Sequence, residues 1–174
     1  MKFRYTTVFI LLSCTILNSQ QEKISPERVF NLLTGMWYEV ALSPPEIRGD
    51  CRCNTFDFEY IHGRTYLQAT FRCIIFRNQK SRIQVNQFKL YPSGLTGEVL
   101  RSGGVSGEKY QLVTLNGDLN IIVIYNTHRQ YIHLLSRDAY IPAYKFDEVV
   151  KLLNNKGYNT TRLKKTMQNC DLIE

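Results

Sequence analysis

The sequence predicts an all-β protein: an eight-stranded antiparallel up-and-down barrel with a C-terminal α-helix packed outside it. Three observations lead to this prediction. The 174 residues include eleven Tyr and nine Phe, and aromatic residues favour the half-buried, pleated surface of a sheet. Eight strand-like segments follow one another with short connections, and closing such a meander into a barrel removes its exposed edges. A segment with helical periodicity follows the last strand.

The N-terminal 19 residues are typical of a secretory signal peptide, so we expect a secreted, extracellular protein whose mature domain spans residues 20–174. Lys2 and Arg4 provide the positive start, residues 8–17 are largely apolar, and a small residue precedes the expected cut. The apolar stretch is too short to cross a bilayer as a helix. No later stretch reaches the required length, so we expect no integral membrane association.

The same region fits a second interpretation. Residues 11–14 resemble a bacterial lipobox, in which Cys14 would be acylated and would become the new N-terminus. The four remaining cysteines and the sequon at Asn159 favour a eukaryotic secretory route instead. We therefore expect disulfide bonds and a glycan on Asn159.

The predicted elements begin with a short helix. Ser25 is suited to cap it, Pro26 suits its first position, and Gly35 ends it. Turn signals such as His62-Gly63 and Asn116-Gly117 then separate the strands. The eight predicted strands are residues 37–42, 53–61, 64–76, 82–91, 95–100, 110–115, 120–125 and 130–137.

The predicted strand around residues 121–125 is apolar at every position, which indicates that both of its faces are covered. The barrel interior covers one face, and the other face needs an element packed outside the barrel. Residues 142–156 provide that element, because their apolar side chains recur at helical spacing. The residues of this apolar face are Phe146, Val149, Val150 and Leu153.

The sequence shows no sign of an enzyme or of a nucleic-acid-binding protein. Its formal net charge is +7, but the basic residues are dispersed rather than gathered into one footprint. No nucleophile elbow, zinc-protease motif or phosphate-binding loop is present. The histidines at 62, 128 and 133 show no metal-ligand spacing with cysteines or acids. We therefore expect no catalytic residue, no metal and no cofactor.

Several motifs resemble those of the lipocalin family. Gly35-Met36-Trp37 matches the G-x-W signature at the start of the first strand, and Arg137 matches the arginine at the end of the eighth. Residues 159–170 resemble the tail of the apolipoprotein D and crustacyanin branch. The resemblance covers residues 26–170. It departs at residues 115–118, which read Leu-Asn-Gly-Asp where the family has a Thr-Asp-Tyr motif.

The resemblance implies a structural pair and a function. Trp37 would close the narrow end of the barrel, with Arg137 across its indole in a cation–π contact of about 0.5–2 kcal/mol. The protein would carry a small hydrophobic ligand, such as a fatty acid, retinoid, carotenoid, steroid or bilin, in the barrel cavity. In the alternative interpretation it is a secreted protein-interaction module that uses loops at the barrel mouth, above all residues 44–48. A homo- or hetero-oligomer is compatible with either, because crustacyanin-like relatives assemble.

The candidate ligand contacts are strand residues that could line the cavity. Phe56 stands where apolipoprotein D has an inward Tyr. His133 lies four residues before Arg137 on the same face, and we consider three roles for it: a hydrogen bond to a neighbouring side chain, a hydrogen bond to ligand, and haem ligation. Parity alone does not say which face points inward. The complete candidate set is Phe56, Phe58, Tyr66, Phe71, Phe88, Tyr110, Leu112, Val123, Tyr125 and His133.

Four cysteines follow the signal peptide. The resemblance pairs Cys51 with Cys170, because relatives place the partner of the C-terminal cysteine at that point. Cys53 and Cys73 would then form the second disulfide. The alternative pairing, Cys53 with Cys170 and Cys51 with Cys73, stays open, whereas a bridge between Cys51 and Cys53 would be strained.

The hairpin between the second and third strands bears on this choice. A three-residue loop at 62–64 sets Cys53 opposite Cys73. A two-residue loop instead sets the apolar residues from 56 to 60 opposite residues 65–69, which matches the apolar faces better. Both features require a β-bulge, so we expect a bulge in this hairpin and retain the Cys53–Cys73 bridge.

Overall fold

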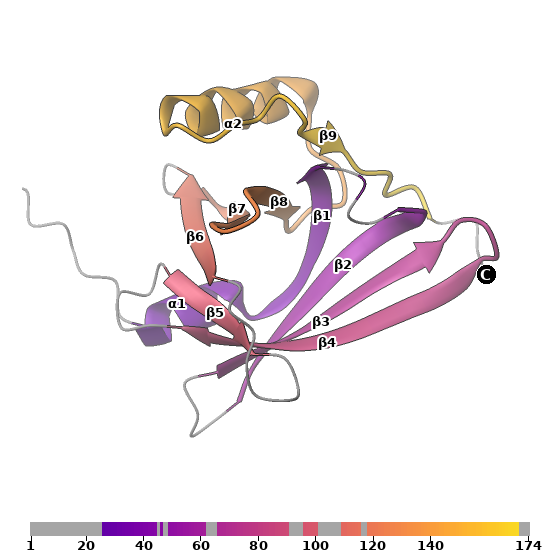
Figure 1. Ribbon diagram of the computed structural model, residues 1–174, viewed down its shortest axis with the longest axis horizontal. Coiled ribbons are helices and arrows are strands. Elements are labelled where there is room, and N and C mark those ends of the chain that lie inside the picture. Colours follow the sequence, from indigo (N-terminus) through magenta and orange to yellow (C-terminus); the bar gives the residue numbers. More distant parts are fainter. Residues whose placement is uncertain are drawn as a thin grey trace, which may run out of the picture.

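The computed structural model describes residues 26–44, 46, 49–61, 66–90, 96–100, 109–115 and 118–170. It confirms the barrel and its outer helix (Figure 1). The predicted signal peptide and Cys14 lie outside these ranges, as does most of the loop surface predicted at residues 44–48.

All eight predicted strands and both predicted helices are present, and the tail adds one short strand that was not predicted. The elements are α1 (Pro26–Leu33), β1 (Gly35–Ser43), β2 (Cys51–Tyr60), β3 (Tyr66–Ile75), β4 (Lys80–Leu90), β5 (Thr96–Leu100), β6 (Lys109–Leu115), β7 (Asp118–Asn126), β8 (Tyr131–Ser136), α2 (Ala143–Asn155) and β9 (Lys164–Lys165). Neither helix is long and apolar enough to cross a membrane, within the described part of the chain.

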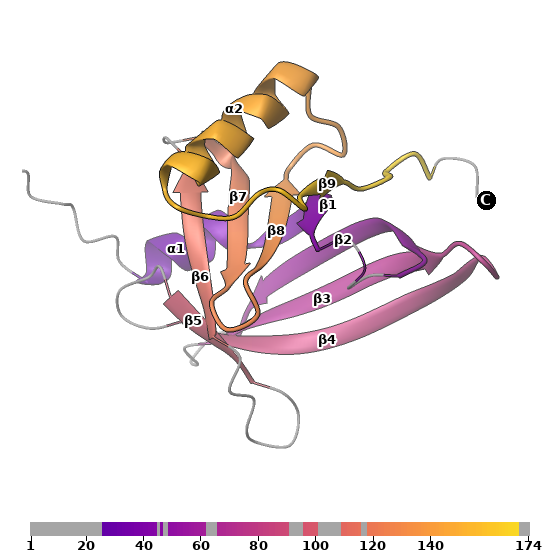
Figure 2. The same cartoon turned by 45° about the horizontal axis from the view of Figure 1, so that its top comes forward.

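The strands form one antiparallel sheet that closes on itself through β1. Each strand from β2 to β8 pairs with the next, and β1 pairs with both β8 and β2. The pairing with β2 extends only over Gly35–Tyr38, whereas the pairing with β8 continues to Ser43. Beyond Tyr38, β9 pairs with β1 at Ala41 and Leu42 in place of β2 (Figure 2). The C-terminal tail therefore lies where β1 and β2 diverge.

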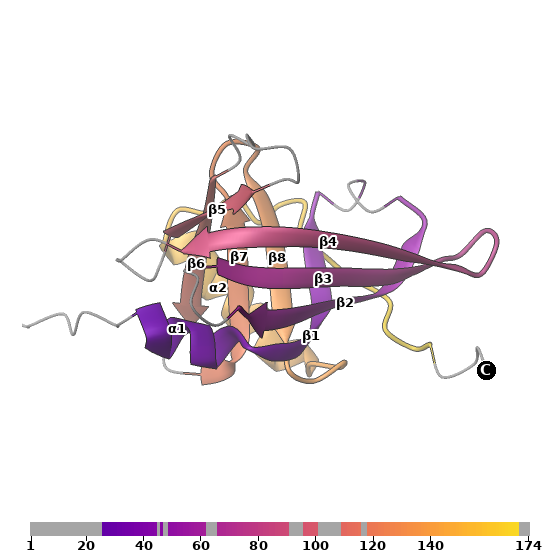
Figure 3. The same cartoon turned by 90° about the horizontal axis from the view of Figure 1, so that it is seen from below.

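An inner cluster of apolar side chains faces the barrel interior. From α1 and β1 it includes Phe30 and Trp37, and from β7 it includes Ile122 and Ile124. The strands pack these residues against the aromatic side chains of β2 and β3. Figure 3 shows α1 at one end of the barrel and the turn between β3 and β4 at the opposite end.

An outer cluster lies between the barrel wall and α2. Ile121 and Val123 of β7 pack there together with Val149 and Leu153 of α2, all of them buried. Alternate residues of β7 thus belong to the inner and outer clusters, as the uninterrupted apolar run in this strand predicts. The outer helix therefore holds one wall of the barrel from outside and leaves the interior to the inner cluster.

Candidate ligand-binding site

One end of the barrel is closed by the predicted pair of Trp37 and Arg137. The Trp37 side chain is completely buried, and its Nε1 donates a hydrogen bond to the Leu33 carbonyl at 2.7 Å. The Arg137 guanidinium carbon lies 3.8 Å from the centroid of the indole ring. The cation–π contact that the family resemblance implied is confirmed.

Backbone carbonyls at the junction of α1 and β1 hold the Arg137 guanidinium in place. Its Nη2 donates to the carbonyls of Leu32 and Thr34 at 2.9 and 2.8 Å, and its Nη1 donates to that of Met36 at 2.9 Å. Partial burial lowers the pKa of Arg137, because desolvation disfavours the charged form. Gly35 has φ +94°, and a Cβ there would lie 3.3 Å from Nη1 of Arg137. Glycine is therefore required for the backbone path under the arginine.

Most of the predicted ligand contacts whose side chains the structure describes do come together inside the barrel. Phe56, Phe58 and Phe71 are buried in the inner cluster, and Tyr110 and Leu112 pack against it with partial exposure. The ring centroids of Phe56 and Phe71 are 5.2 Å apart, and those of Phe56 and Phe58 are 6.0 Å apart. These residues belong to one apolar cluster inside the barrel.

Two predicted contacts, Val123 and Tyr125, are wrong. Val123 is buried in the outer cluster, and the Tyr125 ring lies 4.8 Å from the ring of Tyr158, outside the barrel wall. The inward residues of β7 are Ile122 and Ile124. Because β7 is apolar on both faces, hydrophobicity gave no way to choose between the two parities. Tyr66 and Phe88 lie in β3 and β4, but their side chains are outside the described part.

A buried polar cluster of three side chains, Glu39, Asn54 and His133, interrupts this apolar interior. Glu39 and Asn54 are completely buried, and His133 is 8% exposed. Asn54 Nδ2 donates to Glu39 Oε2 at 2.6 Å, and His133 Nδ1 lies 2.7 Å from Glu39 Oε1. The cluster joins the neighbouring strands β8, β1 and β2, and the His133 ring lies edge-on to Phe56 with centroids 6.2 Å apart.

The structure confirms that His133 forms a hydrogen bond with a neighbouring side chain. A hydrogen bond from His133 to ligand stays a prediction, and no group of three metal-ligating side chains occurs within the described ranges. Glu39 and Asn54 were not among the predicted site residues. Their parity could have identified them, because Glu39 is two residues after the inward Trp37 and Asn54 is two residues before the inward Phe56.

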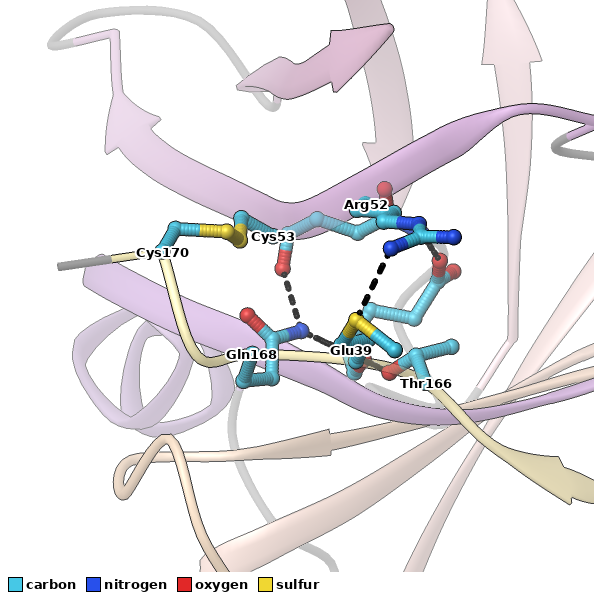
Figure 4. Close-up of a disulfide and its surroundings, with 8 residues drawn as sticks. Glu39, Arg52, Cys53, Thr166, Gln168 and Cys170 are labelled. Atoms are coloured by element: carbon cyan, nitrogen blue, oxygen red, sulfur yellow. Dashed lines mark hydrogen bonds between the residues drawn. A yellow bond between two sulfur atoms is a disulfide. The ribbon is translucent and has the colours of Figure 1, made fainter. Parts of the chain in front are cut away.

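The tail stabilises the backbone on which the polar cluster stands. Val40 accepts a hydrogen bond from the Thr166 amide at 3.0 Å, and the Cys53 amide donates to the Met167 carbonyl at 2.9 Å. Gln168 Nε2 donates to the carbonyl of Glu39 at 2.8 Å and to that of Asn54 at 3.2 Å, and the Thr166 hydroxyl also donates to the Glu39 carbonyl. Figure 4 shows these tail residues beside Glu39 and Cys53. They bridge the gap between β1 and β2.

The predicted disulfide pairing, Cys51–Cys170 with Cys53–Cys73, is wrong, and the alternative pairing is present. Cys51 is bonded to Cys73 and Cys53 to Cys170, with Cα–Cα distances of 5.5 and 6.1 Å. The reason is local. Cys53 has φ +52°, and its amide donates to the tail rather than to β3. The backbone therefore turns Cys53 toward the C-terminal segment and leaves Cys73 to Cys51.

The β-bulge expected in this hairpin is confirmed. The register of β2 against β3 shifts between Arg52 and Thr55, which is where Cys53 adopts its positive φ. Beyond the bulge, Phe56 pairs with Phe71 and Phe58 with Ala69. The two-residue loop would have paired Phe56 with Ala69, so that register was also wrong. A bulge of this kind changes which side chains can meet.

The predicted glycosylation residue, Asn159, is exposed at the surface after α2. Its Oδ1 accepts hydrogen bonds from the Thr161 amide at 3.1 Å and from the Thr161 hydroxyl at 2.6 Å. The side chain is therefore held in a local turn by the third residue of its own sequon.

Comparison with known proteins agrees with the motifs and the fold. No curated protein sequence matches the chain. Lobster apocrustacyanin A1 has a similar structure, with a TM-score of 0.60, 17% sequence identity, and coverage of 83% of this chain and 86% of that one. Insecticyanin from the tobacco hornworm Manduca sexta has a TM-score of 0.58 and 12% sequence identity, with coverage of 78% of each chain.

A mammalian protein has the same fold. The bovine lipocalin allergen Bos d 2 aligns with a TM-score of 0.58 and 12% identity, over 83% of this chain and 99% of the allergen. The family of lipocalin-like domains matches residues 31–168, a range that contains Trp37, the polar cluster and Arg137. The chain therefore belongs to the lipocalin family.

Proposed function

We propose that this protein is an extracellular carrier that binds a small hydrophobic ligand inside its barrel. The observation that carries the proposal is the interior itself: an apolar, aromatic-rich lining above an end that Trp37 and Arg137 close. Each 100 Å² of apolar ligand surface removed from water there would contribute about 2.5 kcal/mol to binding. A fatty acid, retinoid, carotenoid, steroid or bilin has enough apolar surface to be held in this way.

The contacts we propose are the inward residues of the strands. Phe56, Phe58 and Phe71 provide aromatic surface, and Tyr110 and Leu112 are partly exposed beside them. Tyr66 and Phe88 remain proposed contacts from the sequence. His133 is the proposed polar contact in the lining. Because one end is closed, the ligand would enter from the opposite end, on the side of the turn between β3 and β4.

The two disulfides support an extracellular location, since such bonds persist in oxidising compartments. We propose that residues 1–19 are removed as a signal peptide and that Asn159 carries a glycan. The proposal includes no catalytic step, no metal and no cofactor. The protein would act by binding alone, as a monomer or as part of an oligomer.

Mass spectrometry tests the carrier proposal directly. The chain would be produced in a eukaryotic secretory system, exposed to a broad natural lipid extract, and measured under native and denaturing conditions. We expect the native mass to exceed the denatured mass by that of one small molecule. The denatured mass would also report the signal cut, the Asn159 glycan and the hydrogens lost in forming two disulfides. Asn159→Gln is the control for the glycan.

A matched pair of variants locates the bound molecule. Ala69 is buried in the inner cluster, so Ala69→Phe would fill the interior and abolish the mass difference. Val85 is 55% exposed, so Val85→Leu should leave the mass difference unchanged. If the wild-type protein shows no bound mass after the lipid extract, the carrier proposal fails. The alternative of a protein-interaction module that uses the mouth loops would then gain weight.

A further inference from the structure

Burying the polar cluster in the protein interior costs free energy. Glu39 and Asn54 have no solvent exposure, and His133 has little. Burying a polar group costs free energy unless its hydrogen bonds are satisfied. A protein with buried ionic groups is often less stable than one with apolar groups of similar volume in their place. The strands around the cluster are otherwise lined by residues such as Phe56 and Leu135. The position of the cluster is therefore unusual for a purely structural feature.

One atom of the cluster has its hydrogen-bonding capacity unmet. Asn54 Oδ1 is buried and has no hydrogen-bond partner among the described residues. The orientation of this amide follows from chemistry, because the amide nitrogen can donate to the Glu39 carboxylate and the amide oxygen cannot. A buried acceptor without a partner destabilises the fold, because it has lost its hydrogen bonds to water and gained none in exchange. The interior thus presents an acceptor that a donor from elsewhere would stabilise.

His133 is the second neighbour of Glu39 in the cluster. Its Nδ1 faces Glu39 Oε1 at 2.7 Å, where a carboxylate can only accept, so the Nδ1 proton lies between the two atoms. Glu39 fixes the orientation of both neighbouring side chains, since one of its oxygens is hydrogen-bonded to Asn54 and the other to His133. Asn54 Oδ1 is therefore the buried acceptor of the cluster that is left for an incoming donor.

The depth of the cluster matches a ligand that enters from the open end. Trp37 pairs with Phe56 at one level of the barrel. Glu39 and Asn54 are each two residues nearer the open end than those two residues, and His133 pairs with Leu42 on the same side. A ligand packed on the aromatic side chains would therefore pass beside the cluster.

We propose that the polar cluster is the subsite for a hydroxyl group on an otherwise apolar ligand, with Asn54 Oδ1 as its main acceptor. This inference rests on the carrier function proposed above and narrows it. The ligand class is an alcohol, and a fatty acid is disfavoured because its carboxylate would face acceptors and the Glu39 carboxylate. Glu39 is the positioning residue that sets the direction of the Asn54 and His133 side chains.

A series of matched probes tests the subsite. Decan-1-ol, 1-methoxynonane and decanoic acid have similar length, but only the alcohol carries a neutral hydrogen-bond donor. Each would displace the fluorescent probe N-phenyl-1-naphthylamine from the wild-type protein at neutral pH. We expect decan-1-ol to bind roughly tenfold more tightly than 1-methoxynonane, the effect of one satisfied buried hydrogen bond. Decanoic acid should bind most weakly.

Variants of the polar cluster test whether its residues cause the preference for the alcohol over the ether. In Asn54→Leu the alcohol and the ether should bind equally, with the ether affinity retained. Because this change also takes a donor from Glu39, a second variant replaces the whole cluster: Glu39→Leu/Asn54→Leu/His133→Phe. Gln84→Leu is the matched control, since Gln84 is an amide that pairs across from Phe71 and bonds to Asn86. It should leave the preference unchanged.

The outcomes separate the two proposals. Equal binding of alcohol and ether by the wild-type protein would overturn the hydroxyl subsite and leave the carrier function standing. Tightest binding of decanoic acid would do the same, as would an alcohol preference that persists in the triple variant. If neither the fluorescent probe nor any member of the series binds, the carrier function itself fails, and the subsite with it.

Discussion

The barrel contains two sets of polar groups that differ in how their hydrogen bonds are satisfied. At the closed end, Arg137 donates to three backbone carbonyls and stacks on Trp37. At mid-depth, Glu39 joins two side chains, and Asn54 keeps an acceptor without a partner. Within the described chain, the first set has no buried side-chain atom without a hydrogen-bond partner, whereas the second has one, Asn54 Oδ1.

The difference indicates what each set is for. The partners of Arg137 are backbone groups that the junction of α1 and β1 supplies whenever the fold forms, and the arginine remains partly exposed. This arrangement stabilises the barrel at little cost in desolvation. The polar cluster is almost completely desolvated, since His133 alone of its three residues keeps some exposure. It depends on side chains from three strands, and we expect it to stabilise the fold less than apolar packing would. The closed end stabilises the fold, and we infer that the polar cluster binds the ligand.

The largest effect is expected at the closed end. Trp37→Ala removes a completely buried side chain and the ring beneath Arg137, and should lower the free energy of unfolding by about 3–5 kcal/mol. Denaturant unfolding measures this change. The control is Met36→Ala, because Met36 is its neighbour and is 49% exposed. Equal losses in the two variants would contradict a structural role for the Trp37–Arg137 pair.

The next effect concerns the polar cluster. Glu39→Ala leaves Asn54 Nδ2 and His133 Nδ1 buried without their acceptor and should cost about 3 kcal/mol of unfolding free energy. Replacing all three residues, Glu39→Leu/Asn54→Leu/His133→Phe, should restore wild-type stability or exceed it. The same denaturant experiment compares the two variants. A triple variant less stable than Glu39→Ala would show that the cluster stabilises the fold.

The strand pattern and the closed end could be predicted from the sequence because both depend on local signals. Turn residues separate the strands, apolar periodicity marks α2, and the G-x-W signature with Arg137 identifies the closed end through its family resemblance. Each of these features follows from a few neighbouring residues or from a motif. Their agreement with the structure therefore does not depend on knowing the exact register of the sheet.

The errors arose where one backbone detail decides the outcome. In β7 both faces are covered, so the apolar run could not show that Val123 points outward. At Cys53, a positive φ at a bulge turns the side chain toward the tail and exchanges the disulfide partners. The polar cluster was missed for a related reason, since Glu39 and Asn54 meet only where β1 leaves β2. Parity places Glu39 and Asn54 on the inward face, but composition and periodicity do not specify which side chains meet there, which face of β7 points inward, or where the bulge falls.

A smaller effect is expected from the glycine beneath Arg137. Gly35→Ala places a methyl group 3.3 Å from Arg137 Nη1, on a residue with φ +94°, and should cost about 1–3 kcal/mol. Gly157→Ala is a matched control, because Gly157 has φ +85° and a Cβ there would meet no atom of the described chain within 4 Å. Thermal unfolding should show a larger loss for Gly35→Ala. Equal losses would mean that backbone strain alone, and not the contact with Arg137, requires this glycine.

The smallest effect is expected from a charge pair at the surface. Arg162 Nη2 lies 2.8 Å from Glu46 Oε2, but the two side chains are 63% and 67% exposed. Arg162→Ala should therefore cost less than about 1 kcal/mol, and the loss should disappear in about 1 M salt, where the screening length is near 3 Å. Denaturant unfolding at two salt concentrations measures both the loss and its salt dependence.

The distance in this surface pair is close to the 2.7 Å between Glu39 and His133. A small loss of stability in Arg162→Ala beside a large loss in Glu39→Ala would therefore show that burial, and not separation, sets the contribution of a charge. A loss at Arg162 that matched the loss at Glu39 and persisted in salt would remove the basis for distinguishing the polar cluster from the surface.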